Sequence, residues 1–140
     1  MLRSRRRSAC FIVLLIATTA AACPVLAGDA FPFGSELMLE AAAMPGSKRI
    51  PMLEIEDDGT ASIDLWCTSL HAQATVTANS IAIVPGQAES QVQAPQCDPE
   101  RQADDATLLA ALTEATKWRR SGDRVELSGG ATLHYRLMTN

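Results

Sequence analysis

Residues 51–67 read PMLEIEDDGTASIDLWC, and this stretch decides the fold. Apolar and charged side chains alternate before Asp57, which is the period-two pattern of a half-buried strand. Asp58-Gly59 readily supplies the positive φ angles of a tight turn, and a second alternating run then ends at Cys67. The stretch therefore predicts an antiparallel hairpin whose second strand carries a cysteine.

Further strand-like runs lie on both sides of this hairpin. Residues 72–77 and 81–84 are separated by Ala78-Asn79-Ser80 and predict a second hairpin. Residues 123–136 contain two alternating runs around a Ser-Gly-Gly turn and predict a third. Residues 36–42 fit a helix or a strand by periodicity, and we favour a strand.

One helix is expected after the second hairpin. Asp98-Pro99-Glu100 has the residue types of a helix start, although Asp104 and Asp105 could open the helix instead. Four residues at helical spacing would form its apolar stripe: Leu108, Leu109, Leu112 and Ala115.

We expect this helix to end near Trp118, with Gly122 as its stop. Lys117, Arg119 and Arg120 form a small basic patch, which we interpret as compensation of the helix dipole. One helix among about six or seven mostly antiparallel strands predicts an α+β domain. Its form would be a strongly bent sheet or partial barrel, with the one main helix packed on it.

The first 27 residues have the three parts of a secretory signal peptide: arginines, an apolar run and small residues. Two processing sites compete. Cleavage after Ala27 would follow Val-Leu-Ala, whereas residues 20–23 form a loose lipobox that would make Cys23 the lipidated first residue. We favour cleavage after Ala27, which leaves residues 28–140 as a single domain that is exported and periplasmic or envelope-associated.

Charge limits the classes of partner. Residues 1–27 hold four of the twelve basic residues and none of the sixteen acidic ones, so the processed chain would carry a net charge of −8. Such a surface repels phosphate backbones and anionic headgroups. We therefore expect no nucleic-acid partner, and contact with a membrane only through a lipid on Cys23.

Export would leave two thiols, Cys67 and Cys97, in an oxidising compartment, which favours one disulfide between them. Closing a loop of this length stabilises a domain by roughly 3–4 kcal/mol in the chain-entropy model. Two alternatives have less support. A nucleophilic Cys67 would leave Cys97 as an odd thiol, and a metal site with His71 lacks the usual paired spacing.

Trp66 and Trp118 are candidates for an exposed binding surface, because tryptophan is enriched at recognition hot spots. Packing in or near the core is the interpretation we favour for both. His71 and His134 are expected on strand surfaces. We expect no catalytic residue, no metal site and no cofactor.

Several of these features together resemble the META domain family, which includes HslJ-like bacterial envelope proteins. They are the approach from Gly59 to Cys67, the second cysteine at 97, the Leu-rich helix, and the closing pair GDRVEL and ATLHYR. The resemblance covers roughly Phe31 to Met138. Where many members have a Gly-Cys-Asn-like segment, this chain has Trp66-Cys67-Thr68.

The resemblance implies a small exported α+β domain, often attached as a lipoprotein and linked to envelope or heat stress, with no established enzyme activity. We therefore expect a noncatalytic, monomeric envelope domain that binds an unidentified envelope protein or small ligand. The alternative is a secreted or periplasmic enzyme inhibitor that presents residues 84–96, VPGQAESQVQAPQ, as a rigid loop.

Overall fold

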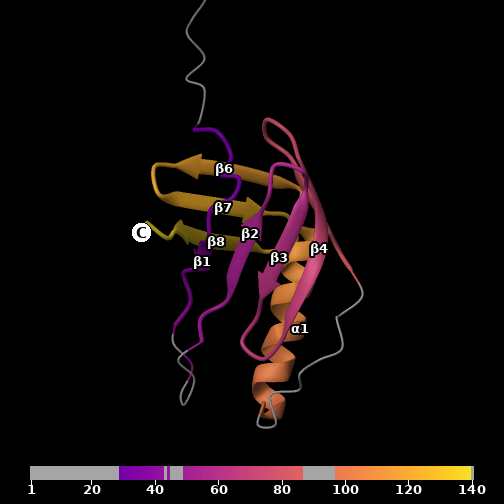
Figure 1. Ribbon diagram of the computed structural model, residues 1–140. Coiled ribbons are helices and arrows are strands. Elements are labelled where there is room, and N and C mark those ends of the chain that lie inside the picture. The colour runs from indigo at the N-terminus through magenta and orange to yellow at the C-terminus, as the bar shows by residue number, and fades with distance from the viewer. Residues whose placement is uncertain (1–28, 43, 45–48, 87–96, 140) are drawn as a thin grey trace, which may run out of the picture.

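The computed structural model describes residues 29–42, 44, 49–86 and 97–139 (Figure 1). These parts of the chain form one antiparallel sheet in the order β5-β4-β3-β2-β1-β8-β7-β6, together with one helix, so the predicted α+β class is confirmed. The elements are β1 (Leu37–Leu39), β2 (Met52–Ile55), β3 (Thr60–Asp64), β4 (Ser69–Val76), β5 (Ile81–Pro85), α1 (Pro99–Glu114), β6 (Lys117–Ser121), β7 (Arg124–Ser128) and β8 (Thr132–Leu137).

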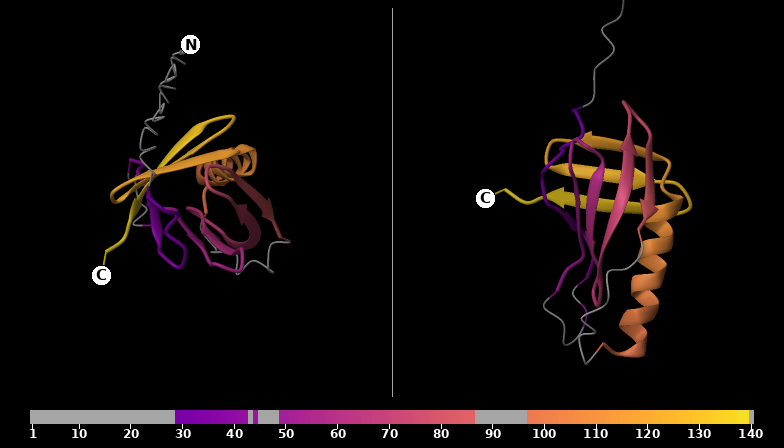
Figure 2. Two further views of the ribbon diagram at one scale, coloured as in Figure 1. Left: turned by 90° about the horizontal axis from the view of Figure 1, so that it is seen from above. Right: turned by 45° about the vertical axis from the view of Figure 1, so that its right-hand side comes forward.

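The sheet is strongly bent and nearly closes into a barrel. Figure 1 shows β6, β7 and β8 running across the direction of β2, β3 and β4. The two edge strands meet where Ser80 and Lys117 form an antiparallel bridge, next to which the Ile81 amide donates to the Thr116 carbonyl at 3.1 Å. Seen from above, the sheet curls round with α1 alongside β5, which bears out the predicted partial barrel (Figure 2).

Alternation along the strands builds the core. Each strand turns every second side chain inward, and the most deeply buried ones are large. The helix adds Leu108 and Leu112 from its apolar stripe. Fully buried strand residues include Leu37, Leu53, Ile63, Val125, Leu127 and Tyr135.

The predicted hairpins are present. In the first, Gly59 has a φ of +87° and the Asp58 side chain accepts from the Thr60 amide at 2.7 Å, as expected for an Asp-Gly turn. A Cβ on Gly59 would lie 2.6 Å from the Ala74 carbonyl oxygen, so this position requires glycine for two reasons.

The predicted helix start at Asp98 is confirmed, because its side chain accepts from the Arg101 amide at 2.9 Å. The alternative start at Asp104 or Asp105 is wrong, since both lie inside α1. The predicted helix end is also wrong.

Helix α1 ends at Glu114, and strand β6 begins three residues later and covers Lys117–Ser121. Trp118 is buried between exposed neighbours, so burial follows period two and not 3.6. Lys117, Arg119 and Arg120 thus lie on a strand, where no helix dipole accounts for them. Gly122, with φ +63°, begins the β6–β7 turn.

Two predicted strands are shorter than expected. β1 covers only Leu37–Leu39, against a predicted run over 36–42. β3 ends at Asp64, and the Leu65 amide donates to the Thr68 carbonyl at 2.8 Å across a tight β3–β4 turn. Cys67 therefore lies in a turn and not in a strand, because this segment leaves the sheet to meet α1.

Candidate functional site

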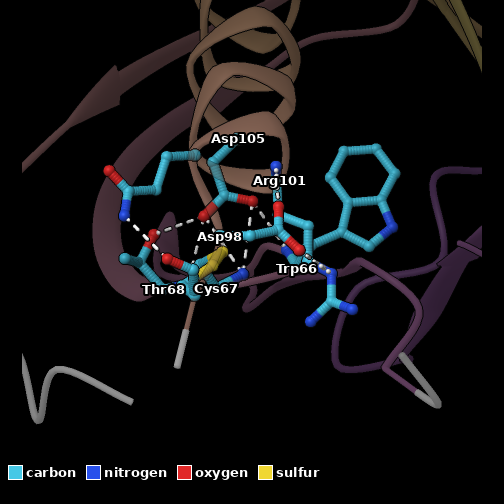
Figure 3. Close-up of a disulfide and its surroundings, with 8 residues drawn as sticks. Trp66, Cys67, Thr68, Asp98, Arg101 and Asp105 are labelled. Carbon is cyan, nitrogen blue, oxygen red and sulfur yellow. Dashed lines mark hydrogen bonds and ion pairs between the residues drawn. A yellow bond between two sulfur atoms is a disulfide. The ribbon is translucent and has the colours of Figure 1, made fainter. Parts of the chain in front are cut away.

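The β3–β4 turn and the start of α1 are joined by a disulfide between Cys67 and Cys97 (Figure 3). The two Cα atoms are 5.8 Å apart, within the range that a disulfide spans. Cys67 is buried, and Cys97 directly precedes the helix N-cap. The predicted pairing is confirmed.

A buried carboxylate holds the same turn from the helix side. Asp105 is only 6% exposed, and its oxygens accept from the backbone amides of Trp66 at 2.8 Å, Cys67 at 3.1 Å and Thr68 at 3.1 Å. The Thr68 hydroxyl also donates to it at 3.1 Å. Three successive amides that converge on one anion form a nest. Here the anion is a side chain of the protein itself (Figure 3).

The disulfide and the Asp105 hydrogen bonds hold the start of α1 against the sheet. Pro99, Glu100, Gln102 and Ala103 are exposed, so the first turn of α1 buries little apolar surface against the sheet. A local hydrogen bond adds to these links, since the side-chain amide of Gln102 donates to the Cys97 carbonyl at 3.0 Å. The sulfurs and the Asp105 oxygens thus bind groups of the protein itself. Their role in this arrangement is to attach the β3–β4 turn to α1.

Sequence reasoning missed the role of Asp105. The signal was its place on the apolar stripe, three residues before Leu108 and seven before Leu112. An acidic side chain at such a position faces the core and requires donors there. The donors that it meets lie on a turn about 38 residues upstream, as the Cys67–Asp105 contact shows. The sequence alone does not reveal that this turn reaches the helix.

The two tryptophans are not brought together. Trp118 lies on β6, where its indole N–H donates to the Thr77 carbonyl at 2.8 Å and its ring meets Phe31 edge-on at 5.1 Å. Trp66 lies in the β3–β4 turn, partly buried against the core, with its ring pointing away from the Asp105 carboxylate (Figure 3). They flank opposite ends of the eight-residue strand β4, roughly 25 Å apart along it.

Both histidines are exposed on strand surfaces. His134 on β8 lies opposite Glu126 on β7, with Nδ1 3.6 Å from a carboxylate oxygen that Arg119 on β6 approaches at 2.9 Å. The hydrogen bond from Arg119 holds the pKa of Glu126 below its usual range. Arg119, Glu126 and His134 thus form a row of polar side chains across three strands.

His71 lines a hollow of about 260 Å³ on the outer face of β3 and β4. The hollow also contains Asp64 and Ser69, whose side chains hydrogen-bond to each other and both accept from Arg49, at 2.9 Å and 2.6 Å. It has room for a small polar molecule. Within the described residues, no group of three or more His, Cys, Asp or Glu side chains is arranged to hold a metal ion.

Comparison with known proteins agrees with this architecture. A family model described as META domain matches residues 35–139. A solved structure titled "NMR structure of the protein" is 15% identical, with a TM-score of 0.56 over 74% of this chain and 88% of its own, and therefore shows likeness of fold. No curated protein matches. In the described parts of the chain, no helix is long and apolar enough to cross a membrane.

Proposed function

Because this chain belongs to the META domain family, we propose that it is a noncatalytic binding domain of the bacterial cell envelope, exported by its first 27 residues. The single observation that carries this proposal is the disulfide between Cys67 and Cys97. Disulfides persist in oxidising compartments and are rare in the cytoplasm, where thiols are kept reduced.

The contacts at the β3–β4 turn argue against a catalytic role for Cys67. A nucleophilic cysteine requires a free thiolate beside a base, whereas Cys67 is bonded to Cys97 and its amide is bound to Asp105. Two links at one junction fix the turn relative to the helix. A rigid junction of this kind suits a domain that presents a fixed surface.

The partner under this proposal is an envelope protein or a small ligand, bound by a monomer. Processing after Ala27 releases the domain into the periplasm, whereas lipid on Cys23 would anchor it to the envelope. The inhibitor alternative placed its contact loop at residues 84–96, most of which lie outside the described residues, and it stays a prediction.

Fractionation tests the export. The full chain, and a version that lacks residues 2–27, would be expressed with a C-terminal tag in a bacterium, and intact cells would be treated with an amine crosslinker before lysis. We expect the full chain in the envelope or periplasmic fraction with crosslinked partners, and the truncated chain in the cytoplasm. A full chain that stays cytoplasmic and unprocessed would refute the proposal.

A further inference from the structure

The outer side of the C-terminal meander carries a basic face, which we define as Lys117 and Arg119 on β6, Arg124 on β7, and Arg136 on β8. Their neighbours Trp118, Val125 and Tyr135 are buried, so period two directs these four side chains outward. Since α1 ends at Glu114, dipole compensation does not explain Lys117 or Arg119. The helix dipole therefore does not account for this face.

Two glutamates hold the arginines of this face in place. Arg119 is 77% exposed and lies 2.9 Å from Glu126, which is 23% exposed. Arg136 and Arg124 both approach one oxygen of Glu40, at 2.8 Å and 3.4 Å. Arg136 also lies 3.9 Å from Asp123. The two glutamates are less exposed than the arginines that they pair with, so these arginine side chains are held by ion pairs and still reach solvent.

Charge is divided unevenly between the two parts of the domain. Residues 117–137 hold five basic and two acidic side chains, whereas the other described residues hold two basic and thirteen acidic ones. On the basic face itself, the four basic side chains lie among three acidic ones, Glu40, Asp123 and Glu126, so the face is slightly positive on a protein that is negative overall. A local positive field attracts anions and orients their approach.

We propose that the basic face binds an acid-rich, extended segment of a partner protein. Arginine N–H groups are strong donors to carboxylates, and Arg136 and Arg119 already donate to Glu40 and Glu126 on this face. An extended segment presents alternate side chains about 7 Å apart, close to the separation of residues i and i+2 such as Lys117 and Arg119 on β6.

This inference rests on the proposed binding function and adds the surface and the chemistry of the partner. The test is fluorescence anisotropy with a labelled twelve-residue peptide of alternating glutamate and serine, and with the same peptide carrying glutamine for glutamate. The test variant is Arg119→Gln with Arg124→Gln. The matched control, Arg49→Gln with Arg101→Gln, removes the same charge from elsewhere on the domain.

We expect the glutamate peptide to bind, the glutamine peptide not to bind, and affinity to fall as salt rises. The test variant should weaken binding by about tenfold, since two exposed pairs are lost, and the control by less than about twofold. Circular dichroism would verify that both variants fold.

Equal loss in the two variants would overturn the proposal, as would equal binding of both peptides or no binding at 1 mM protein. Binding to phosphatidylglycerol vesicles in place of the peptide would overturn it in favour of a membrane. Self-association lost in the test variant would overturn it in favour of a second copy. None of these results bears on export or on the disulfide, so failure of this inference can be told apart from failure of the proposed function.

Discussion

Replacing Asp105 with alanine should cost far more stability than a helix substitution usually does. The carboxylate accepts from three backbone amides and one hydroxyl, and only 6% of the residue is exposed. Its loss leaves the buried Cys67 amide without an acceptor, which costs about 1–3 kcal/mol. It also removes the acceptor of two half-buried amides, where water can replace part of the lost hydrogen bonding. We expect a total of about 3–4 kcal/mol, which corresponds to roughly 10–20 °C in Tm for a domain of this size.

The assay is urea unfolding followed by circular dichroism, with the disulfide intact and the m-value compared with that of the parent. Asp104→Ala is the matched control, because it changes the neighbouring acid of the same helix and should cost less than about 1 kcal/mol. Asp105→Asn keeps one acceptor oxygen and should fall between the two. If Asp105→Ala unfolds within about 0.5 kcal/mol of the parent, the nest does not stabilise the junction and the reasoning is refuted.

Three further outcomes follow from other contacts. Reducing the Cys67–Cys97 bond should lower the free energy of unfolding by roughly 3–4 kcal/mol while the sheet persists, as measured by urea unfolding with and without reductant; an unchanged midpoint would contradict this. Gly59→Ala should lower the free energy of unfolding by about 1–3 kcal/mol, because it adds a clash with the Ala74 carbonyl to an unfavourable positive φ. In Gly122→Ala the added Cβ meets no atom within 4 Å, so this variant should lose less stability in the same assay. The reverse order would count against the turn geometry. Arg119→Gln should raise the pKa of Glu126, read by NMR titration of its side-chain carboxyl. Because the pKa of Glu126 is depressed in the folded state, the stabilisation from this pair is present above the unfolded pKa and is lost as pH falls through the folded pKa. A Glu126 pKa that the substitution leaves unchanged would show that Arg119 does not cause the depression.

The features that the sequence predicted are local. Asp-Gly at 58–59 and Ser-Gly-Gly at 128–130 contain within a few residues the chemistry that turns a chain, so the first and third hairpins could be located in advance. The N-cap at Asp98 is equally local. The disulfide could be anticipated because the predicted export would leave only two cysteines to pair.

The features that the sequence did not predict depend on distant partners. Lys117–Ser121 contains good helix formers and becomes a strand through pairing with β7 and a bridge to Ser80. The Gly122-Asp123 pair, a typical two-residue hairpin loop, was the local signal for that strand. Asp105 finds its donors only when the β3–β4 turn reaches the helix. The pairing of β1 with β8 likewise joins the two ends of the domain.

The most direct test of the account is the intact mass of the protein recovered from cells, after alkylation under denaturing, nonreducing conditions. We predict a chain that begins at Gly28, or at a lipidated Cys23, and that takes up no alkylating groups because Cys67 and Cys97 are joined. A chain that retains residues 1–27, or one that carries an alkyl group on both Cys67 and Cys97, would contradict an exported domain held together by this bond.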